Sequence, residues 1–127
     1  MRKSANQHFD AGTALDASNK KAVAAYLFGL AAECAVKAIM LHCGIPGTED
    51  RDSAYFAHFP VLRTKLQTLK QGRKNFDDLR FAQKDTFLAD WDITIRYAAS
   101  ADIFSLANRY ERWVESATTA IQQMSKT

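Results

Sequence analysis

The sequence predicts an all-α protein, a bundle of four or five helices that forms a single domain over residues 1–127. The 127 residues are 47% hydrophobic, which suits one core rather than two. Only five Gly and two Pro are present, whereas turns in an all-β domain recur about every eight to twelve residues. Apolar residues recur instead at spacings of three and four, which is typical of helices with one buried face.

The first helix is predicted to begin at Ser4. Ser4 and Gln7 match a capping box, in which the two side chains bind amide groups at a helix start. Apolar residues at helical spacing continue from there to Leu15. Ser18 and Asn19 are predicted to end this helix and to cap the next one.

The second helix is predicted from about Lys20 to Cys43, stopped by Gly44 and Pro46. Residues 22–32 are apolar on every side of this helix, a pattern typical of a helix in the middle of a bundle. Its small residues would let a neighbouring helix or a second subunit approach closely; they are Ala24, Ala25, Gly29, Ala32 and Ala35. Close packing would explain a Gly inside a helix, where Gly costs about 1 kcal/mol relative to Ala.

A long polar connection, residues 44–57, is predicted after the second helix. A shorter third helix should follow from about Phe59 to Lys70. Its inward side chains are predicted to be Val61, Leu62, Leu66 and Leu69. A short helical piece is predicted between Phe76 and Phe87.

Residues 90–97 alternate polar and apolar side chains, which on pattern alone is typical of a strand. A single strand would have no partner in this chain, so we expect an extended connection or a helix start. The last helix is predicted to begin within 100–102 and to continue to about Met124. Its buried stripe is predicted to contain Ile103, Leu106, Ala107, Tyr110, Val114, Ala117, Ile121 and Met124. The side chains predicted to lie outside are Arg109, Arg112 and Glu115.

Positive charge is concentrated in one part of the chain. The net charge is +3, yet residues 60–84 hold seven basic and only two acidic residues. Lys70, Arg73 and Lys74 lie in the middle of this segment and are candidate nucleic-acid contacts, through ion pairing with phosphates and counterion release. The alternative is a solvated surface that keeps the protein soluble.

The sequence also favours a cytoplasmic protein without a membrane partner. The longest apolar run, 22–32, is about half the length of a membrane-spanning helix, and the N-terminus lacks the apolar stretch of a signal peptide. Cys34 and Cys43 lie too far apart on one helix for a mutual disulfide, so we expect reduced thiols. His42 would point about 100° away from Cys43 on that helix. No metal site and no cofactor are therefore predicted.

Three segments carry a resemblance to a known family. Residues 26–38 read YLFGLAAECAVKA, with an aromatic residue, a Gly and an Ala before Glu-Cys-Ala-x-Lys. His58 opens the third helix in HFPVL, and residues 91–97, WDITIRY, lead to Arg-Tyr before the last helix. In this order they resemble the signatures of HEPN domains over most of the chain. The resemblance implies an up-and-down helical bundle, commonly a homodimer, in toxin–antitoxin, phage-defence or RNA-processing settings, where a cognate antitoxin or another protein is a possible partner.

Many HEPN proteins are metal-independent endoribonucleases with an R-x4-6-H motif at a dimer cleft. Such chemistry needs a base for the ribose 2′-hydroxyl and a cation for the phosphorane charge. Arg96 matches the Arg of the motif, but none of the histidines, His8, His42 and His58, follows it. Asp102 occupies the position of the His, although a carboxylate is ordinarily a weak base for a hydroxyl. A cap at the start of the last helix is the favoured interpretation of Asp102. The resemblance therefore implies the fold more firmly than the activity.

Further residues are candidates for ligand binding. Glu33 and Lys37 form an i, i+4 pair on a largely buried helix, either as an ion pair that offsets desolvation or as ligand-binding groups. Arg96 would anchor a phosphate or meet Glu33 across the core. Tyr97 would stack on a base or belong to the core. His58 is interpreted as a residue at a helix start.

These observations lead to three functional hypotheses. The first is a dimeric HEPN-like protein that binds RNA or a nucleotide, with a nuclease motif that lacks its His. The second is a non-catalytic module whose apolar, small-residue face binds another protein. The third is an active metal-independent endoribonuclease that uses Arg96 with Asp102. Binding of RNA that weakens steeply with salt would separate the first hypothesis from the second.

Overall fold

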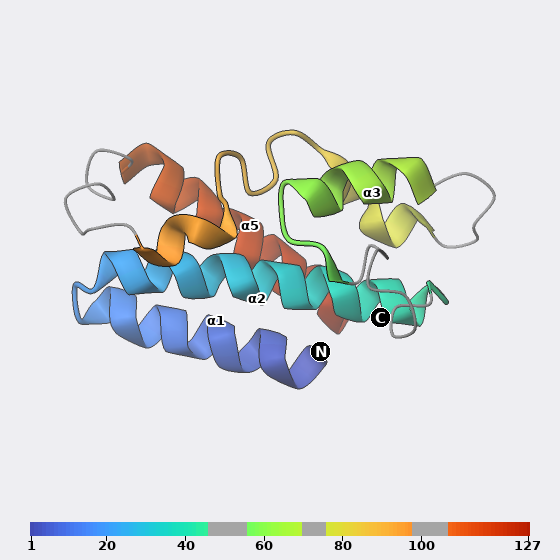
Figure 1. Cartoon of the computed structure of the whole chain (residues 1–127). Coiled ribbons are helices and arrows are strands. Elements are labelled where there is room, and N and C mark those ends of the chain that lie inside the picture. Colours follow the sequence, from blue (N-terminus) through green and yellow to red (C-terminus); the bar gives the residue numbers. More distant parts are fainter. Residues whose placement is uncertain (46–55, 70–75, 98–106) are drawn as a thin grey trace.

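The predicted helical bundle is confirmed. A computed structural model describes residues 1–45, 56–69, 76–97 and 107–127, and every regular element within these ranges is helical (Figure 1). The α-helices are α1 (Arg2–Ala17), α2 (Lys21–His42), α3 (Val61–Leu69) and α5 (Ala107–Ser125). The 3₁₀ helices are η2 (Phe76–Gln83) and η3 (Ile93–Tyr97). The predicted long connection after α2 falls largely on residues 46–55, outside the described ranges.

Helix α2 is the centre of the bundle, as its apolar sequence predicts. It contacts α1, α5, η2 and η3, and Figure 1 shows α1 running antiparallel along one side of it. Its observed bounds lie within one residue of the predicted ones. By length and composition alone α2 would be long enough to cross a membrane, but 72% of its apolar window is buried inside the protein, and a core helix passes the same test.

The first helix starts earlier than predicted, and the capping-box interpretation of Ser4 is wrong. Helix α1 begins at Arg2, and the amide of Ala5 donates to the carbonyl of Met1 at 2.9 Å. Arg2 fixes this end, because its guanidinium donates to the carbonyl of Met124, at 2.7 Å, and to the hydroxyl of Thr127. The end of α5 therefore holds the start of α1, and the helix needs no serine cap.

The turns that end α1 and α2 share one hydrogen-bond pattern. Asn19 adopts a left-handed backbone (φ 61°), and the amide of Lys20 donates to the carbonyl of Leu15 at 2.8 Å. Gly44 (φ 78°) plays the same part after α2, where the amide of Ile45 donates to the carbonyl of Met40 at 3.0 Å. Both are Schellman-type endings. Asn19 thus ends the first helix as predicted but does not cap the second, whose N-cap is Lys20 without a side-chain bond.

Helix α3 begins two residues later than predicted, and one of its predicted inward side chains is exposed. Leu62 and Leu66 are fully buried as expected, but Val61 is 55% exposed, so its predicted inward position is wrong. Phe59, just before the helix, is 1% exposed and packs on Phe87 with ring centroids 5.3 Å apart. Positions 62 and 66 lie on one face of α3, and position 61 is turned about 100° away from position 62.

The segment with strand-like alternation forms no strand; it ends in a short helix, and a helix start was one of the two outcomes that the sequence predicts. Ile93–Tyr97 form η3, and Asp92 accepts hydrogen bonds from the amide and the hydroxyl of Thr94, each at 2.8 Å. The short helical piece predicted between Phe76 and Phe87 is also present, as η2.

Helix α5 buries part of the predicted stripe; Val114 and Ile121, also predicted to be inward, are only partly buried. Tyr110, Ala117 and Met124 are buried, and Trp113 and Ala120 extend the same face. The side chains of Arg109, Arg112 and Glu115 are exposed as predicted. The predicted start at 100–102 and the stripe positions Ile103 and Leu106 lie outside the described residues, and the side chain of Ala107 is not described.

Candidate functional site

The three segments that carry the family resemblance meet on α2. Trp91 is 1% exposed and lies against Gly29, where an added Cβ would be only 1.8 Å from the indole Cε2. The indole Nε1 donates to the carbonyl of Ala25 at 3.1 Å. One turn further along α2, Glu33 binds the His58–Phe59 segment. Two segments distant in sequence therefore attach to consecutive turns of one helix.

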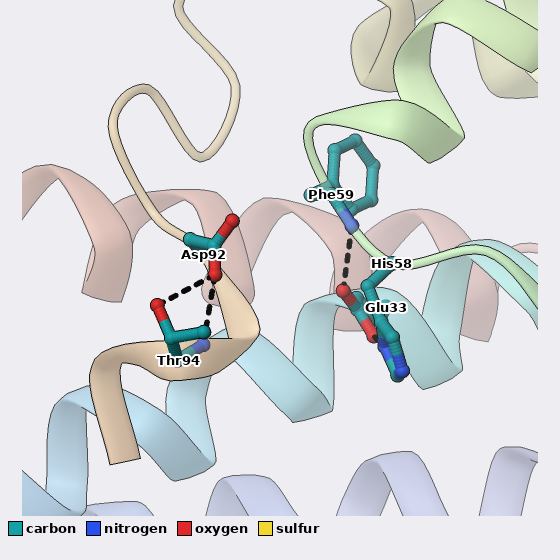
Figure 2. A network of polar contacts seen from close by, with 5 residues as sticks. All are labelled: Glu33, His58, Phe59, Asp92 and Thr94. Atoms are coloured by element: carbon teal, nitrogen blue, oxygen red, sulfur yellow. Dashed lines mark hydrogen bonds and ion pairs between the residues drawn. The ribbon is translucent and has the colours of Figure 1, made fainter. Parts of the chain in front are cut away.

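Glu33 is the buried centre of this site. Its carboxylate accepts the backbone N–H of Phe59 at 2.7 Å through Oε1, and Oε2 lies 2.8 Å from Nδ1 of His58. Figure 2 shows the imidazole against the carboxylate while the ring of Phe59 points away from it. Glu33 is 2% exposed and the side chain of His58 is 48% exposed. The pair thus joins a carboxylate inside the bundle to an imidazole at its surface.

Two other titratable groups lie on the same part of α2. Lys37, one turn after Glu33, is 7% exposed; burial lowers the pKa of its ammonium group, and the charge of Glu33 opposes that shift. Cys34 is half-buried, and burial raises the pKa of its thiol. A raised thiol pKa keeps the group protonated at neutral pH and makes it a poor nucleophile.

Asp92 supplies a further negative charge near His58. The pKa of its carboxyl is lowered, first by the backbone hydrogen bond from Thr94 and then by the hydroxyl of that residue, with a smaller electrostatic contribution from His58. Figure 2 places Asp92 and Thr94 at the start of η3, beside the Glu33 cluster. The imidazole therefore has one buried and one exposed carboxylate in its neighbourhood.

The structure brings together only some of the predicted site residues. Glu33 and Lys37 are adjacent on α2, as predicted. For Arg96 and Tyr97 the backbone belongs to η3, which packs on α2, but their side chains lie outside the described part of the structure. The predicted Glu33–Arg96 pair therefore stays a prediction.

The remaining predicted residues, Asp102, Lys70, Arg73 and Lys74, lie wholly outside the described residues. Sequence analysis missed the principal partner of Glu33. His58 was interpreted only as the residue at a helix start, and its backbone carbonyl does accept the amide of Leu62 at 2.8 Å. The signal that pointed to His58 was its place in the family signature, which carries no information about the distance to Glu33.

The fold and the site together define an all-helical bundle with a buried carboxylate bound to a half-exposed histidine. Comparisons with known families, with curated proteins and with solved structures find no match to this chain. The HEPN assignment consequently stays a prediction. Among the described residues no group of three His, Cys, Asp or Glu side chains is arranged to hold a metal ion.

Proposed function

We propose that this chain is a HEPN-like protein that binds RNA or a nucleotide in a toxin–antitoxin, phage-defence or RNA-processing setting. The observation that carries the proposal is the convergence of the three signature segments on α2. Gly29 receives Trp91, Glu33 receives His58 and Phe59, and η3 packs on the same helix.

The described cations narrow the choice of phosphate-binding residues. Arg63 donates to the carbonyl oxygens of Lys84, at 3.0 Å, and Phe87, and its guanidinium lies 5.6 Å from the ring centre of Phe59. Its contacts are therefore structural. Arg80 is exposed but pairs with Asp77 at 2.6 Å. For the phosphate contacts of the proposal we keep the three basic residues that the sequence predicts, Lys70, Arg73 and Lys74, which lie outside the described residues.

The proposal is tested by RNA binding as a function of salt. Neutralising Lys70, Arg73 and Lys74 to Gln should weaken binding of a single-stranded RNA and flatten the plot of log affinity against log salt by about two units, since each phosphate contact on a single strand contributes about 0.7. A control with the same change of charge neutralises three exposed lysines elsewhere, Lys3, Lys20 and Lys126. Equal affinity and slope in both triple variants would overturn the proposal.

A specific observation supports the second hypothesis, a protein-binding or dimerisation module. Val23 and Leu41 are 50% and 43% exposed, and their separation of 18 residues corresponds to about five turns, which places them on one face of α2. Leu27, Leu30 and Cys34 lie between them on that face and are only partly buried. An apolar stripe of this kind on a helix surface is typical of a protein contact.

Sedimentation measurements test this second function. If the stripe joins two copies, replacing Val23 and Leu41 by Lys should convert a dimer to a monomer. Replacing the exposed Ala11 of α1 by Lys serves as the control and should leave the dimer intact. A wild-type protein that is monomeric at the highest soluble concentration would exclude self-association through this stripe.

A further inference from the structure

We propose that the cleft between α5 and residues 81–89, here called the α5 cleft, binds a zwitterion, namely an α-amino acid with an apolar side chain. The cleft has a volume of about 520 Å³, and small-molecule sites usually measure about 300–1,000 Å³. One wall is a face of α5 with Arg112, Glu115 and Ser116, and the rings of Phe81 and Phe87 belong to the other wall. None of these residues takes part in the Glu33 site or in the proposed contacts to RNA.

Helix α5 presents two opposite charges to the cleft. Arg112 and Glu115 have the i, i+3 spacing at which side chains on one helix face can pair. In the described part of the chain, however, neither side chain forms an ion pair or a hydrogen bond. A guanidinium and a carboxylate on adjacent turns of one helix are therefore both available to a ligand.

Ser116 adds a buried hydrogen-bond donor beside these charges. It is 8% exposed, and its hydroxyl oxygen accepts the amide of Leu88 at 3.0 Å. A hydroxyl also has a hydrogen to donate, and no described residue accepts the hydrogen of Ser116. The hydroxyls of Thr118 and Ser125, on the same helix, each donate to a carbonyl one turn back. Because Ser116 does not do so, its hydrogen is left for an acceptor in the cleft that it lines.

The wall opposite α5 is held in place without a ligand. Arg63 donates to two backbone carbonyls of this wall, and Nε1 of Trp113 donates to a third, that of Ala89, at 2.8 Å. Leu88 adopts a left-handed backbone (φ 49°), which residues other than glycine seldom take. These bonds fix the wall, and a preformed site loses little conformational entropy when a ligand binds.

The charges that line the cleft favour a zwitterion over an ion of one sign. Each wall contributes one cation and one carboxylate, Arg112 and Glu115 on α5 and Lys84 and Asp85 opposite. A phosphate ester would be repelled by both carboxylates, and a dication by both cations. Asp85 already interacts with the charge of Arg63, so Glu115 is the carboxylate that faces the ammonium group of the ligand.

Each group of the ligand has a partner in this arrangement. Its carboxylate accepts from the guanidinium of Arg112 and from the hydroxyl of Ser116, and its ammonium group donates to Glu115. These two groups sit on one carbon of an α-amino acid, which matches partners on adjacent turns of α5. Phe81 and Phe87 form an edge-to-face pair with centroids 5.2 Å apart, and this aromatic surface suits an apolar side chain on the ligand.

Calorimetric titration of the full chain with free L-phenylalanine and free L-leucine tests the site. N-acetyl-L-phenylalanine retains only the carboxylate, and L-phenylalanine amide retains only the ammonium group. Each analogue should bind about tenfold or more weakly than the free amino acid, which is the loss expected for one charged hydrogen bond. Arg112→Gln and Glu115→Gln should each weaken binding of the free amino acid by a similar factor.

Combining variants with analogues identifies which group each residue binds. Arg112→Gln should bind the free amino acid and its amide almost equally, because the partner of the carboxylate is gone. Glu115→Gln should bind the free amino acid and its N-acetyl form almost equally. Arg109→Gln and Glu111→Gln are the matched controls, since they alter exposed residues of α5 that do not line the cleft, and both should bind like the wild type. Circular dichroism checks that each variant is folded.

Three results would overturn the proposal. The first is that neither amino acid binds at millimolar concentration. The second is binding that is unchanged in both Arg112→Gln and Glu115→Gln, which would place the ligand elsewhere. The third is binding of inorganic phosphate or a nucleoside monophosphate in place of the amino acids, which would indicate an anion site. If a variant fails to fold, the two analogues still test the requirement for both charges on the wild-type protein.

Discussion

Replacing Gly29 by Ala tests the contact that joins η3 and its preceding segment to α2. An ideal Cβ at position 29 would lie 1.8 Å from Cε2 of Trp91 and 2.2 Å from its Cζ2 and Nε1. Carbon atoms in contact are about 3.5–4.0 Å apart, so the indole must retreat by roughly 1.5–2 Å. Trp91 is 1% exposed and has no free space into which to move without displacing neighbours.

The expected loss of stability follows from three contributions. Overpacking in a core costs about 1–3 kcal/mol. Retreat of the indole also breaks the 3.1 Å bond from Nε1 to the carbonyl of Ala25, and a buried donor without a partner costs about 1–3 kcal/mol. Alanine returns about 1 kcal/mol of helix propensity. We therefore expect Gly29→Ala to lower the free energy of unfolding by about 3 kcal/mol, or the melting temperature by roughly 10 °C.

Urea unfolding followed by circular dichroism measures the loss, and Gly12→Ala is the matched control. At Gly12 an added Cβ would lie 3.2 Å from the ring of Phe28, so a shift of a few tenths of an ångström accommodates it. This variant should stay within about 1 kcal/mol of the wild type, because the gain in propensity offsets the tighter contact. Comparing the two variants thus separates the gain in helix propensity, which both substitutions share, from the severe steric conflict, which only Gly29→Ala creates.

A double-mutant cycle decides whether the indole is the cause. In a Trp91→Leu background the atoms that conflict with the new Cβ are absent, and Gly29→Ala should be neutral or stabilising by up to about 1 kcal/mol. The same destabilisation in both backgrounds would refute the reasoning, since the cost would then arise elsewhere on α2.

The remaining predictions concern three buried polar contacts. Glu33→Ala leaves the amide of Phe59 without its acceptor and should lower the free energy of unfolding by about 2–4 kcal/mol in urea, more than Glu33→Gln does. Ser116→Ala removes the hydroxyl that accepts the amide of Leu88 at 3.0 Å and should cost about 1–3 kcal/mol in the same assay. Burial is the chief cause of the raised pKa of the Tyr110 phenol. Its contribution to stability is therefore complete below about pH 10 and is lost as the pH rises further. The melting temperatures of Tyr110→Phe and of the wild type should converge above about pH 10.

The controls for these substitutions remove hydroxyls that donate to a carbonyl, rather than hydroxyls that accept a buried backbone amide. Thr118→Ala and Ser125→Ala each delete a hydroxyl that donates to a carbonyl of its own helix turn. Both should change the free energy of unfolding by less than about 0.5 kcal/mol. A loss at Ser116 no larger than at these two positions would show that the amide of Leu88 finds another acceptor. The sign for Tyr110 follows because the unfolded chain, with the lower phenol pKa, loses its proton first.

Helix positions followed from the sequence where apolar spacing and stop signals agreed. The extent of α2 was predictable because its apolar run is long and Gly44 is suited to the left-handed turn after it. The start of α1 was not predictable, since it depends on Arg2 reaching the end of α5, more than 120 positions away in the chain. Local capping patterns carry no information about such a contact.

The inward face of α3 shows a second limit of periodicity. Val61 and Leu62 are both apolar and adjacent, and one helix face cannot bury both fully. The structure buries Leu62 together with Phe59, whose amide donates to Glu33 at 2.7 Å. This hydrogen bond attaches the start of the α3 segment to α2, a contact that the apolar pattern of α3 does not contain.

Of the residues that form the candidate site, the sequence identified Glu33 but neither of its described partners. Glu33 was identified from its place on a buried helix, and a buried carboxylate requires partners. Arg96 was the expected partner because a cation is the usual one for an acid, and its side chain lies outside the described residues. The described partners are a backbone amide and an imidazole from the segment before α3. Neither carries a permanent charge, so no pattern of opposite charges in the sequence identified them.

The spacing of Gly29 and Glu33 explains why that stretch of α2 forms a recognisable signature. They are four positions apart, so they lie on one face of the helix in consecutive turns. Gly29 lacks a side chain and leaves room for the indole of Trp91. Glu33 supplies the carboxylate that binds the backbone amide of Phe59 and the imidazole of His58. Each position fixes a segment from a different part of the chain, and the two attachments are chemically independent. Substitutions at Gly29 should therefore alter stability without changing the tautomer of His58. Glu33→Gln should instead change the tautomer, with a smaller effect on stability. The ¹⁵N chemical shifts of the imidazole would show which nitrogen carries the hydrogen in each variant.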